Sequence, residues 1–188
     1  TLELTVGDVT RTQTFTIKPD PRLWTSAEDL KAQYDLKAAI RDAMSEINER
    51  LTTLGQIRTQ ANDWAKRADN AEITATAETL SDKITKLEDQ LRTAESVSTK
   101  GGENGLHDKL AVLAMAIDES DHAPTAQAAE VWGNLSEDSA TVRYQVQRLI
   151  EDDVAAFTAK VTAAGVPLIS TTPIKTTVKS ESSVSSDD

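Results

Sequence analysis

Apolar side chains recur at helical spacing along the chain from Ser26 to about Ala68. Between Ile40 and Leu54 the steps between them alternate four and three, which is typical of a helix that packs along another helix. Asp29 stands three residues after Ser26, a variant of the capping box with Asp in place of Glu, so we expect the helix to begin there. The predicted stripe consists of Leu30, Tyr34, Ile40, Met44, Ile47, Leu51, Leu54, Ile57, Ala61, Trp64 and Ala68.

A second helix is predicted to begin within residues 69–72 or near Thr76 and to end at about Val97. Its stripe repeats every four and three residues without interruption, and the polar residues fill the positions between. The stripe consists of Ile73, Ala77, Leu80, Ile84, Leu87, Leu91 and Ala94. The link between the first two helices is short, which predicts that they are antiparallel neighbours.

Two more helices follow a glycine-containing loop at residues 98–105. The first runs from about Leu106 to Ile117 and carries Leu106, Leu110, Leu113 and Ile117 on one face. The second is capped by Thr125, runs to about Ala164 and ends at Gly165. Its stripe consists of Ala128, Val131, Leu135, Val142, Val146, Leu149, Phe157 and Val161. We therefore predict a mainly α fold, an antiparallel three- to four-helix bundle with long helices over residues 26–169.

The N-terminal residues 1–17 have the alternating pattern of a β-hairpin. Leu2, Leu4 and Val6 alternate with polar residues, and Gly7-Asp8 suits a tight turn. Because a lone hairpin is marginally stable in water, two interpretations are open. Residues 1–18 are either the terminal strands of an Ig- or fibronectin-like sandwich or a hairpin packed on the helices. The first residue is Thr, and we expect the chain to be a mature or cut piece of a longer protein.

Proline and polar residues mark the boundaries of the helical region. Pro19 and Pro21 predict a stiff linker over residues 19–25, in which we expect Trp24 to pack where the hairpin meets the helices. Residues 170–188 are mostly Ser, Thr, Lys and Asp and are predicted to form a flexible tail. Just before this tail, Leu168 and Ile169 are apolar and are candidates to pack back onto the bundle.

Composition narrows the classes of function. Residues 23–169 carry −10 of the net charge of −11, mixed with Lys and Arg, which is typical of solvated helical faces. The sequence has no basic stripe of the kind that binds nucleic acid or an anionic membrane surface, which argues against both partners. The chain has no Cys, and no apolar run approaches the roughly 20 residues of a membrane span.

The densest polar cluster is Asp118, Glu119, Asp121 and His122. It fails the calcium-loop pattern because Ala123 stands where Gly is required, so we interpret it as a solvated turn rather than a metal site. The histidines, His107 and His122, do not form a zinc-ligand motif, and no nucleophile-elbow motif occurs. The sequence therefore predicts no catalytic, cofactor-binding or metal-binding residue and no cofactor.

Other isolated features have simpler structural interpretations. Gly101, Gly102 and Gly105 do not follow a strand or precede Gly-Lys-Ser/Thr, which argues against a phosphate loop. Trp64 and Trp132 lie on or beside helical stripes, so we interpret them as core or interface residues rather than as a sugar-binding platform. The glycosylation sequon at Asn134 lies inside a predicted helix and is interpreted as chance.

The order of segments resembles a known family. It comprises "FTIKPDPR", then "ITKLEDQL", "LHDKLAVLAMAIDESDHAPTAQ" and "DDVAAFTAKVTAAGVPLI". Over residues 2–169 the chain resembles the C-terminal region of large bacterial exported proteins with sortilin-like BNR-repeat β-propellers, often labelled glycosyl-hydrolase-like. The chain departs from the family at Gly101–Gly105, around Thr158 and in the Ser/Thr-rich tail.

The resemblance implies that residues 1–18 end a sandwich that follows the propellers, and that the chain is extracellular or at the cell surface. We therefore expect a non-catalytic structural and protein-interaction module that docks onto the propeller and sandwich domains of the same protein or onto a partner subunit. No catalytic residue carries over. The alternative is an accessory segment of a propeller hydrolase, glycosidase-like or peptidase-like, that helps to shape its active site.

Overall fold

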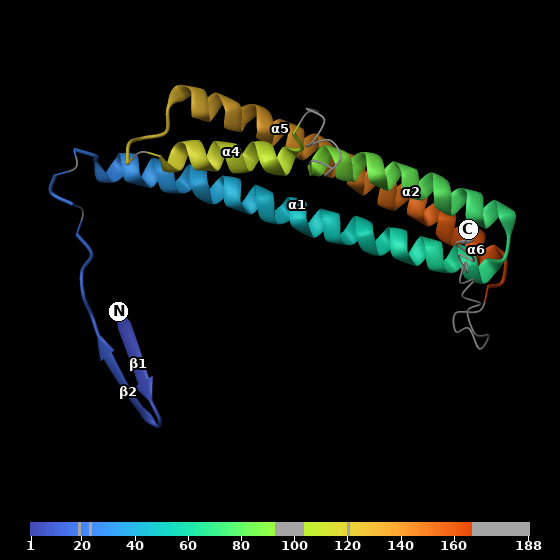
Figure 1. The fold of residues 1–188 in the computed structure, drawn as a ribbon, viewed down its shortest axis with the longest axis horizontal. Helices are drawn as coiled ribbons and strands as arrows, with labels where there is room; N and C mark the ends of the chain where they lie inside the picture. The colour runs from blue at the N-terminus through green and yellow to red at the C-terminus, as the bar shows by residue number, and fades with distance from the viewer. Residues whose placement is uncertain (19, 23, 93–103, 120, 167–188) are drawn as a thin grey trace, which may run out of the picture. The chain divides into compact units, whose positions relative to one another are not determined.

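The computed structural model describes residues 1–18, 20–22, 24–92, 104–119 and 121–166. These residues are mainly helical and carry a two-stranded antiparallel hairpin at the N-terminus, as the sequence predicts (Figure 1). The strands are β1 (Leu2–Val6) and β2 (Val9–Gln13). The helices are α1 (Ala27–Ala68), α2 (Ala71–Leu91), α4 (Leu106–Asp118), α5 (Ala126–Arg148), the π-helix η1 (Leu149–Val154) and α6 (Ala155–Ala163).

The elements form two compact units, and each is described by itself. The first contains Thr1–Glu49 and Asp89–Val142, and the second contains Arg50–Glu88 and the chain from Arg143 onward. The predicted end of the second helix at Val97, the glycines Gly101 and Gly102, the packing of Leu168 and Ile169 and the tail from residue 170 all lie outside the described residues.

The hairpin turns at Gly7-Asp8, since Val6 pairs with Val9. Gly7 has a φ of +58° and Asp8 has no positive φ, which is the pattern of a type II′ turn with Gly at its first central position. The register places Leu2, Leu4 and Val6 on one face, where they pair with Gln13, Arg11 and Val9 respectively. The opposite face is polar and carries a hydrogen bond of 3.1 Å between the hydroxyls of Thr5 and Thr10. Every residue of both strands is exposed.

The helix ends follow the capping signals in the sequence. Asp29 N–H donates to the Ser26 hydroxyl at 3.0 Å, and Ser26 N–H donates to the Asp29 carboxylate at 3.3 Å, which completes the predicted capping box of α1. The Asn70 side chain accepts from the N–H groups of Glu72 and Ile73, so α2 begins in the earlier of the two predicted places. The Thr125 hydroxyl accepts from Ala128 N–H and caps α5.

The predicted stripes supply most of the buried core. In the first unit the fully or nearly buried residues include Ile40, Ile47, Leu91, Leu106, Leu110, Leu113, Ile117, Leu135 and Val142. In the second unit they include Leu54, Ala61, Ile73, Ala77, Leu80, Ile84, Leu87, Val146, Leu149, Phe157 and Val161. No charged or polar residue is buried among the described residues, so each core is held together by apolar contacts.

Several apolar residues near the start of the helical region are exposed, contrary to the prediction. Trp24 is 99% exposed, so its predicted packing between the hairpin and the helices is wrong. The reason is that no hairpin residue is buried, and the described residues therefore form no interface there for the indole ring. Leu30 and Tyr34 of α1 and Val131 of α5 are also exposed, although the stripes include them.

The last predicted helix contains a π-helical segment, η1, between α5 and α6. Leu149, Asp153, Phe157 and Val161 follow one another at steps of four residues. In an uninterrupted α-helix these 12 residues would turn the face by about 120° beyond whole turns, at about 100° per residue. A π turn takes up an extra residue and reduces this drift to about 20°. Leu149, Phe157 and Val161 can therefore all be buried.

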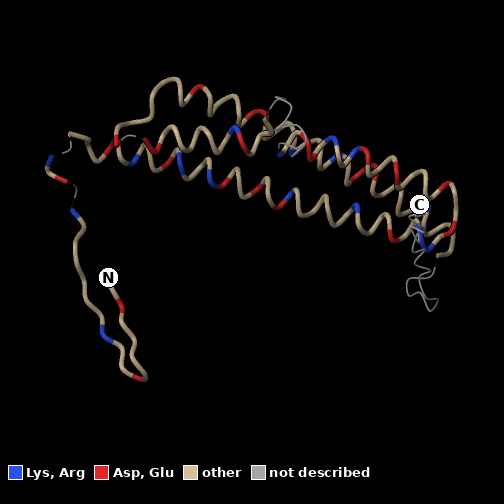
Figure 2. The backbone as a smooth tube through the Cα atoms, in the orientation of Figure 1, with Lys and Arg blue, Asp and Glu red and all other residues tan. Residues whose placement is uncertain are grey.

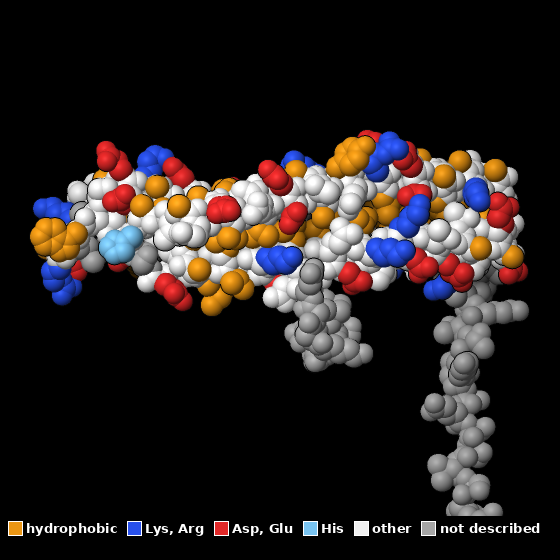
Figure 3. Space-filling view, turned by 90° about the horizontal axis from the view of Figure 1, so that it is seen from above, with side chains coloured by type: hydrophobic (Ala, Val, Ile, Leu, Met, Phe, Trp, Pro, Cys, Tyr) orange, Lys and Arg blue, Asp and Glu red, His pale blue; other side chains and the backbone are white. Residues whose placement is uncertain are grey.

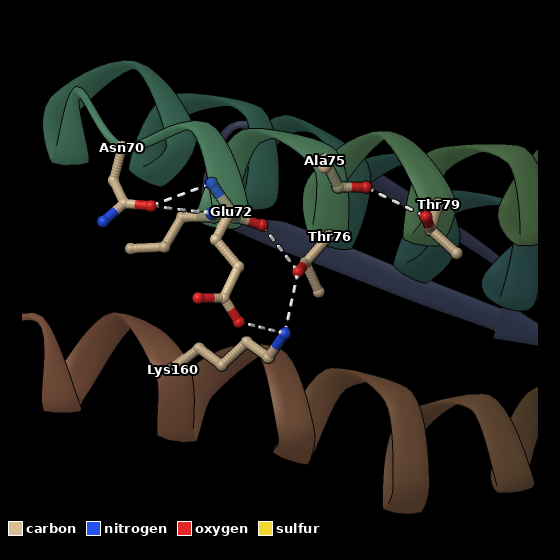
Figure 4. A network of polar contacts seen from close by, with 7 residues as sticks. Asn70, Glu72, Ala75, Thr76, Thr79 and Lys160 are labelled. Atoms are coloured by element: carbon tan, nitrogen blue, oxygen red, sulfur yellow. Dashed lines mark hydrogen bonds and ion pairs between the residues drawn. The ribbon is translucent and has the colours of Figure 1, made fainter.

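Charged side chains of both signs alternate along the helices (Figure 2). In the second unit, Lys160 of α6 donates to the Glu72 carboxylate at 2.9 Å and to the Thr76 hydroxyl at 3.2 Å (Figure 4). Lys83 pairs with Asp153 of η1 at 2.6 Å. These contacts join α2 to η1 and α6 at the surface, where an ion pair contributes up to about 1 kcal/mol.

Candidate functional site

The described residues of the second unit enclose a cavity of about 450 Å³. It lies among α1, α2, η1 and α6, and its walls include Ile57, Trp64, Leu80, Val154, Phe157 and Val166. Cavities of a few hundred Å³ with mainly apolar walls are typical of sites for small ligands or inserted side chains. The cavity is therefore our candidate functional site.

The chemistry of the cavity favours binding over catalysis. Its polar lining residues are Gln60, Thr158 and Thr162, and none of its lining residues is ionisable. The Thr158 hydroxyl donates to the carbonyl of Val154 at 2.8 Å, and the Thr162 hydroxyl donates to the carbonyl of Thr158 at 2.8 Å. The walls thus offer an apolar group a dry surface, and they hold no general acid or base.

Trp64 lies between the cavity and a positively charged side chain. It is half-buried in the cavity wall, and the Arg67 guanidinium lies 5.2 Å from the centroid of its ring. A cation within about 6 Å of an indole face attracts it and restricts its movement. One side of Trp64 therefore belongs to the cavity. Trp132, the other tryptophan of the predicted stripes, is half-buried in α5 of the first unit.

The acidic cluster after α4 is spread over an exposed turn. Asp118 is the last residue of α4 and forms an ion pair with Lys37 of α1. Beside it, the side-chain amide of Gln33 donates to the carbonyl of Ile117 at 2.9 Å. Glu119, Asp121 and His122 are exposed. Among the described residues no group of three or more His, Cys, Asp and Glu side chains could hold a metal ion.

The remaining candidates lie apart from the cavity. His107 Nδ1 is 3.6 Å from the Asp108 carboxylate, which is too long for a hydrogen bond. Gly105 precedes α4 with extended backbone, φ −64° and ψ 163°, as its N-cap. Asn134 lies within α5, as the sequence predicts.

The linker holds a local ion pair rather than a site. The Arg22 guanidinium donates to both carboxylate oxygens of Asp20, at 2.6 to 3.1 Å, and the Arg22 backbone N–H donates to one of them. These hydrogen bonds hold the pKa of Asp20 below its usual range. Both side chains lie at the surface. We therefore interpret the pair as a local contact that fixes the turn of the chain at Pro21.

Comparisons of the chain with protein-family models, with curated proteins and with solved structures find no match. Within the described residues, no helix combines the length and the apolar character that a membrane span requires. The resemblance to the sortilin-like propeller proteins therefore stays a prediction from the sequence.

The cavity itself could not be found by sequence reasoning. The stripes correctly bury Leu80, Phe157 and Val161, yet a stripe says which face is apolar and not whether that face is filled. The available signal was the run of four-residue steps from Leu149 to Val161, which marks the π-helical segment beside the cavity.

Proposed function

We propose that this chain is a non-catalytic structural and protein-interaction module, the C-terminal part of a large exported β-propeller protein, attached to neighbouring β-domains through its hairpin. The observation that carries the proposal is the apolar face of that hairpin. Leu2, Leu4, Val6 and Val9 share this face with Arg11 and Gln13, and each of the four apolar residues is between 59% and 69% exposed.

The hairpin has the residue pattern of a sheet with one face buried and the other exposed to water. Antiparallel sheets with one buried face place apolar residues on that face and polar residues on the other. Here the face opposite the apolar one carries Glu3, Thr5, Thr10 and Thr12. A pair of strands alone is marginally stable in water, and its outer edges offer unpaired N–H and C=O groups to further strands. The pattern supports the proposal that the hairpin completes an Ig-like sandwich.

The helices support the architectural part of the proposal. We infer an antiparallel bundle, since the two residues Asp69 and Asn70 connect α1 to α2. In the second unit Arg58 of α1 forms an ion pair with Glu88 of α2, as expected of neighbouring helices. Figure 3 shows hydrophobic side chains between the charged ones on the face that it displays.

The proposal assigns no chemical step to the cavity, whose lining consists of apolar residues with Gln60, Thr158 and Thr162. The resemblance implies that any catalytic chemistry of the parent protein lies in its propellers.

The test is the mass of the native particle that contains this chain, measured by light scattering after gentle purification. Co-purifying polypeptides are identified by peptide sequencing. Leu4→Lys adds a positive charge to this face of the hairpin, opposite Arg11, and Thr12→Lys adds the same charge to the other face, opposite Glu3, as a control for the added charge. An unpaired charge buried in a sheet interface is strongly unfavourable.

We expect the wild-type chain and the Thr12→Lys variant to be found in a particle much larger than 20.3 kDa, with β-propeller and sandwich peptides present. Leu4→Lys should lose those contacts or make them sensitive to proteolysis. A wild-type monomer of 20.3 kDa that unfolds cooperatively would overturn the proposal. Equal effects of the two lysine variants would overturn the role of the apolar face.

A further inference from the structure

The apolar face of the hairpin contains one charged side chain, that of Arg11. The strand register places Arg11 directly opposite Leu4, and Val9 and Gln13 are its neighbours along β2 on the same face. Among the paired residues of the two strands, the other charged residue is Glu3, which lies on the opposite face. The face that we propose to be covered therefore carries a positive charge among aliphatic side chains.

Arg11 lies within the length of this face rather than at its end. After Gln13 the chain runs on from β2, away from the turn, through Phe15 and Ile17 (Figure 1). Alternate side chains of an extended chain point to the same side, so an extended course over these residues adds Phe15 and Ile17 to the face of Arg11. Their side chains are 56% and 84% exposed.

The described residues supply no partner for the Arg11 guanidinium. Its side chain makes no hydrogen bond and no ion pair within residues 1–18 or with the other described parts of the chain. In water its five N–H donors are hydrated. When another sheet covers the face, this hydration is lost, and an unpaired charge in an apolar interface is strongly unfavourable.

A carboxylate is the group that best replaces this water. The planar guanidinium donates two parallel hydrogen bonds to a carboxylate, and such charge-assisted pairs are among the strongest in proteins. Complementary charges across an interface also fix its register and exclude partners that lack the matching charge. The charge on this face of the hairpin therefore favours an acidic group on the surface that covers it.

We propose that the β-sheet that covers the apolar face of the hairpin presents an Asp or Glu side chain to Arg11, within a surface that is otherwise apolar. This inference rests on the proposed function, because it takes the cover to be a sheet of a neighbouring β-domain. The competing arrangement needs no carboxylate. In it the aliphatic stem of Arg11 lies along the covered face while the guanidinium reaches water at the edge of β2.

The test compares three substitutions of Arg11 in the full chain, within the native particle. Arg11→Lys keeps the charge and loses the planar fork, Arg11→Met keeps an apolar stem without charge, and Arg11→Glu reverses the charge. Lys18→Glu makes the same change of net charge at an exposed residue outside the strands and is the matched control. The readouts are the fraction of chain that stays in the particle on serial dilution, measured by light scattering, and chymotrypsin cleavage after Leu4 and Phe15.

We expect the association to weaken in the order Arg11→Lys, Arg11→Met, Arg11→Glu, with Lys18→Glu equal to the wild type. The loss in Arg11→Met should be about 30-fold or more, because truncation of one member of a buried charge pair leaves the other unpaired. Cleavage after Leu4 and Phe15 should become faster in the same order, because the face is then uncovered.

Two results would overturn the inference and leave the proposed function in place. One is an Arg11→Met chain that is held as tightly as the wild type, since the guanidinium then reaches water. The other is a Lys18→Glu chain that is released as readily as Arg11→Glu, since the effect then follows net charge alone. A wild-type chain that is monomeric would overturn the proposed function, and this inference with it.

Discussion

Two leucines on α1 give a direct test of the helical register. Leu54 is completely buried, whereas Leu51, one turn earlier, is half-buried. The two positions are about 60° apart around the helix, at about 100° per residue. Substitution by alanine removes the same atoms at both positions, so the difference in stability reports burial alone.

The magnitude follows from the burial of each side chain. Leu54→Ala deletes fully buried methyl groups and leaves a cavity, which for leucine costs about 3–5 kcal/mol. Leu51→Ala removes side-chain area that is already partly in water, so we expect a loss of about 1–2 kcal/mol. The expected difference between the two variants is therefore about 2 kcal/mol or more.

The assay is urea unfolding followed by circular dichroism at a helical wavelength. With a slope of about 1–3 kcal/mol per molar urea, a loss of about 3–5 kcal/mol in Leu54→Ala should lower the midpoint by roughly 1–5 M. The slope should not change, because the same surface is exposed on unfolding. If Leu51→Ala destabilises the chain as much as Leu54→Ala, or more, the face of α1 that we assign to the core is wrong.

Four further variants probe other features. Gly165→Ala should destabilise the chain by about 1–2 kcal/mol because of its positive φ, whereas Gly133→Ala within α5 should stabilise it by about 0.5–1 kcal/mol; thermal melting measures both. Ser26→Ala should cost about 0.5–2 kcal/mol through loss of the N-cap, seen in the same melts. The hydrogen bond from Lys160 lowers the pKa of Glu72, and the positive charge of Lys160 lowers it further. The pair therefore stabilises the fold at pH values above the unfolded pKa of Glu, and this stabilisation is lost as the pH falls through the folded pKa. Lys160→Met should raise the Glu72 pKa in an NMR titration; an unchanged value would refute the contact.

The helices could be predicted from the sequence because their signals are local. The capping box at Ser26 and the start at Asn70 each depend on side chains within three residues of the helix end. The stripe of α4 depends on a period of 3.6 residues, which any single helix shows by itself. The described bounds of α1 and α4 accordingly lie within one residue of the predicted ones.

The exposed apolar residues could not be predicted because burial depends on neighbours. Leu30 and Tyr34 continue the period of α1, yet they are 37% and 67% exposed. Trp24 is a large aromatic residue of the kind that packs in a core, but its side chain is 99% exposed. A sequence pattern gives the apolar face of a helix, and the contacts of that face come from segments distant in the sequence.

The hairpin and the cavity pose the same physical question, namely what covers an apolar surface, and they lead to different answers. At the hairpin, Leu4 and Val6 are 63% and 69% exposed, and the cover that we propose for them is a neighbouring β-sheet. At the cavity, part of the cover comes from the chain itself, because Val166 lines its wall beside Phe157. The two answers can therefore be separated by experiment. Leu4→Lys should change the particle mass and leave the emission of Trp64 as it is, measured in a chain in which Trp24 and Trp132 are replaced by Phe. A Leu4→Lys variant that also changed the Trp64 emission would show that one partner covers both surfaces.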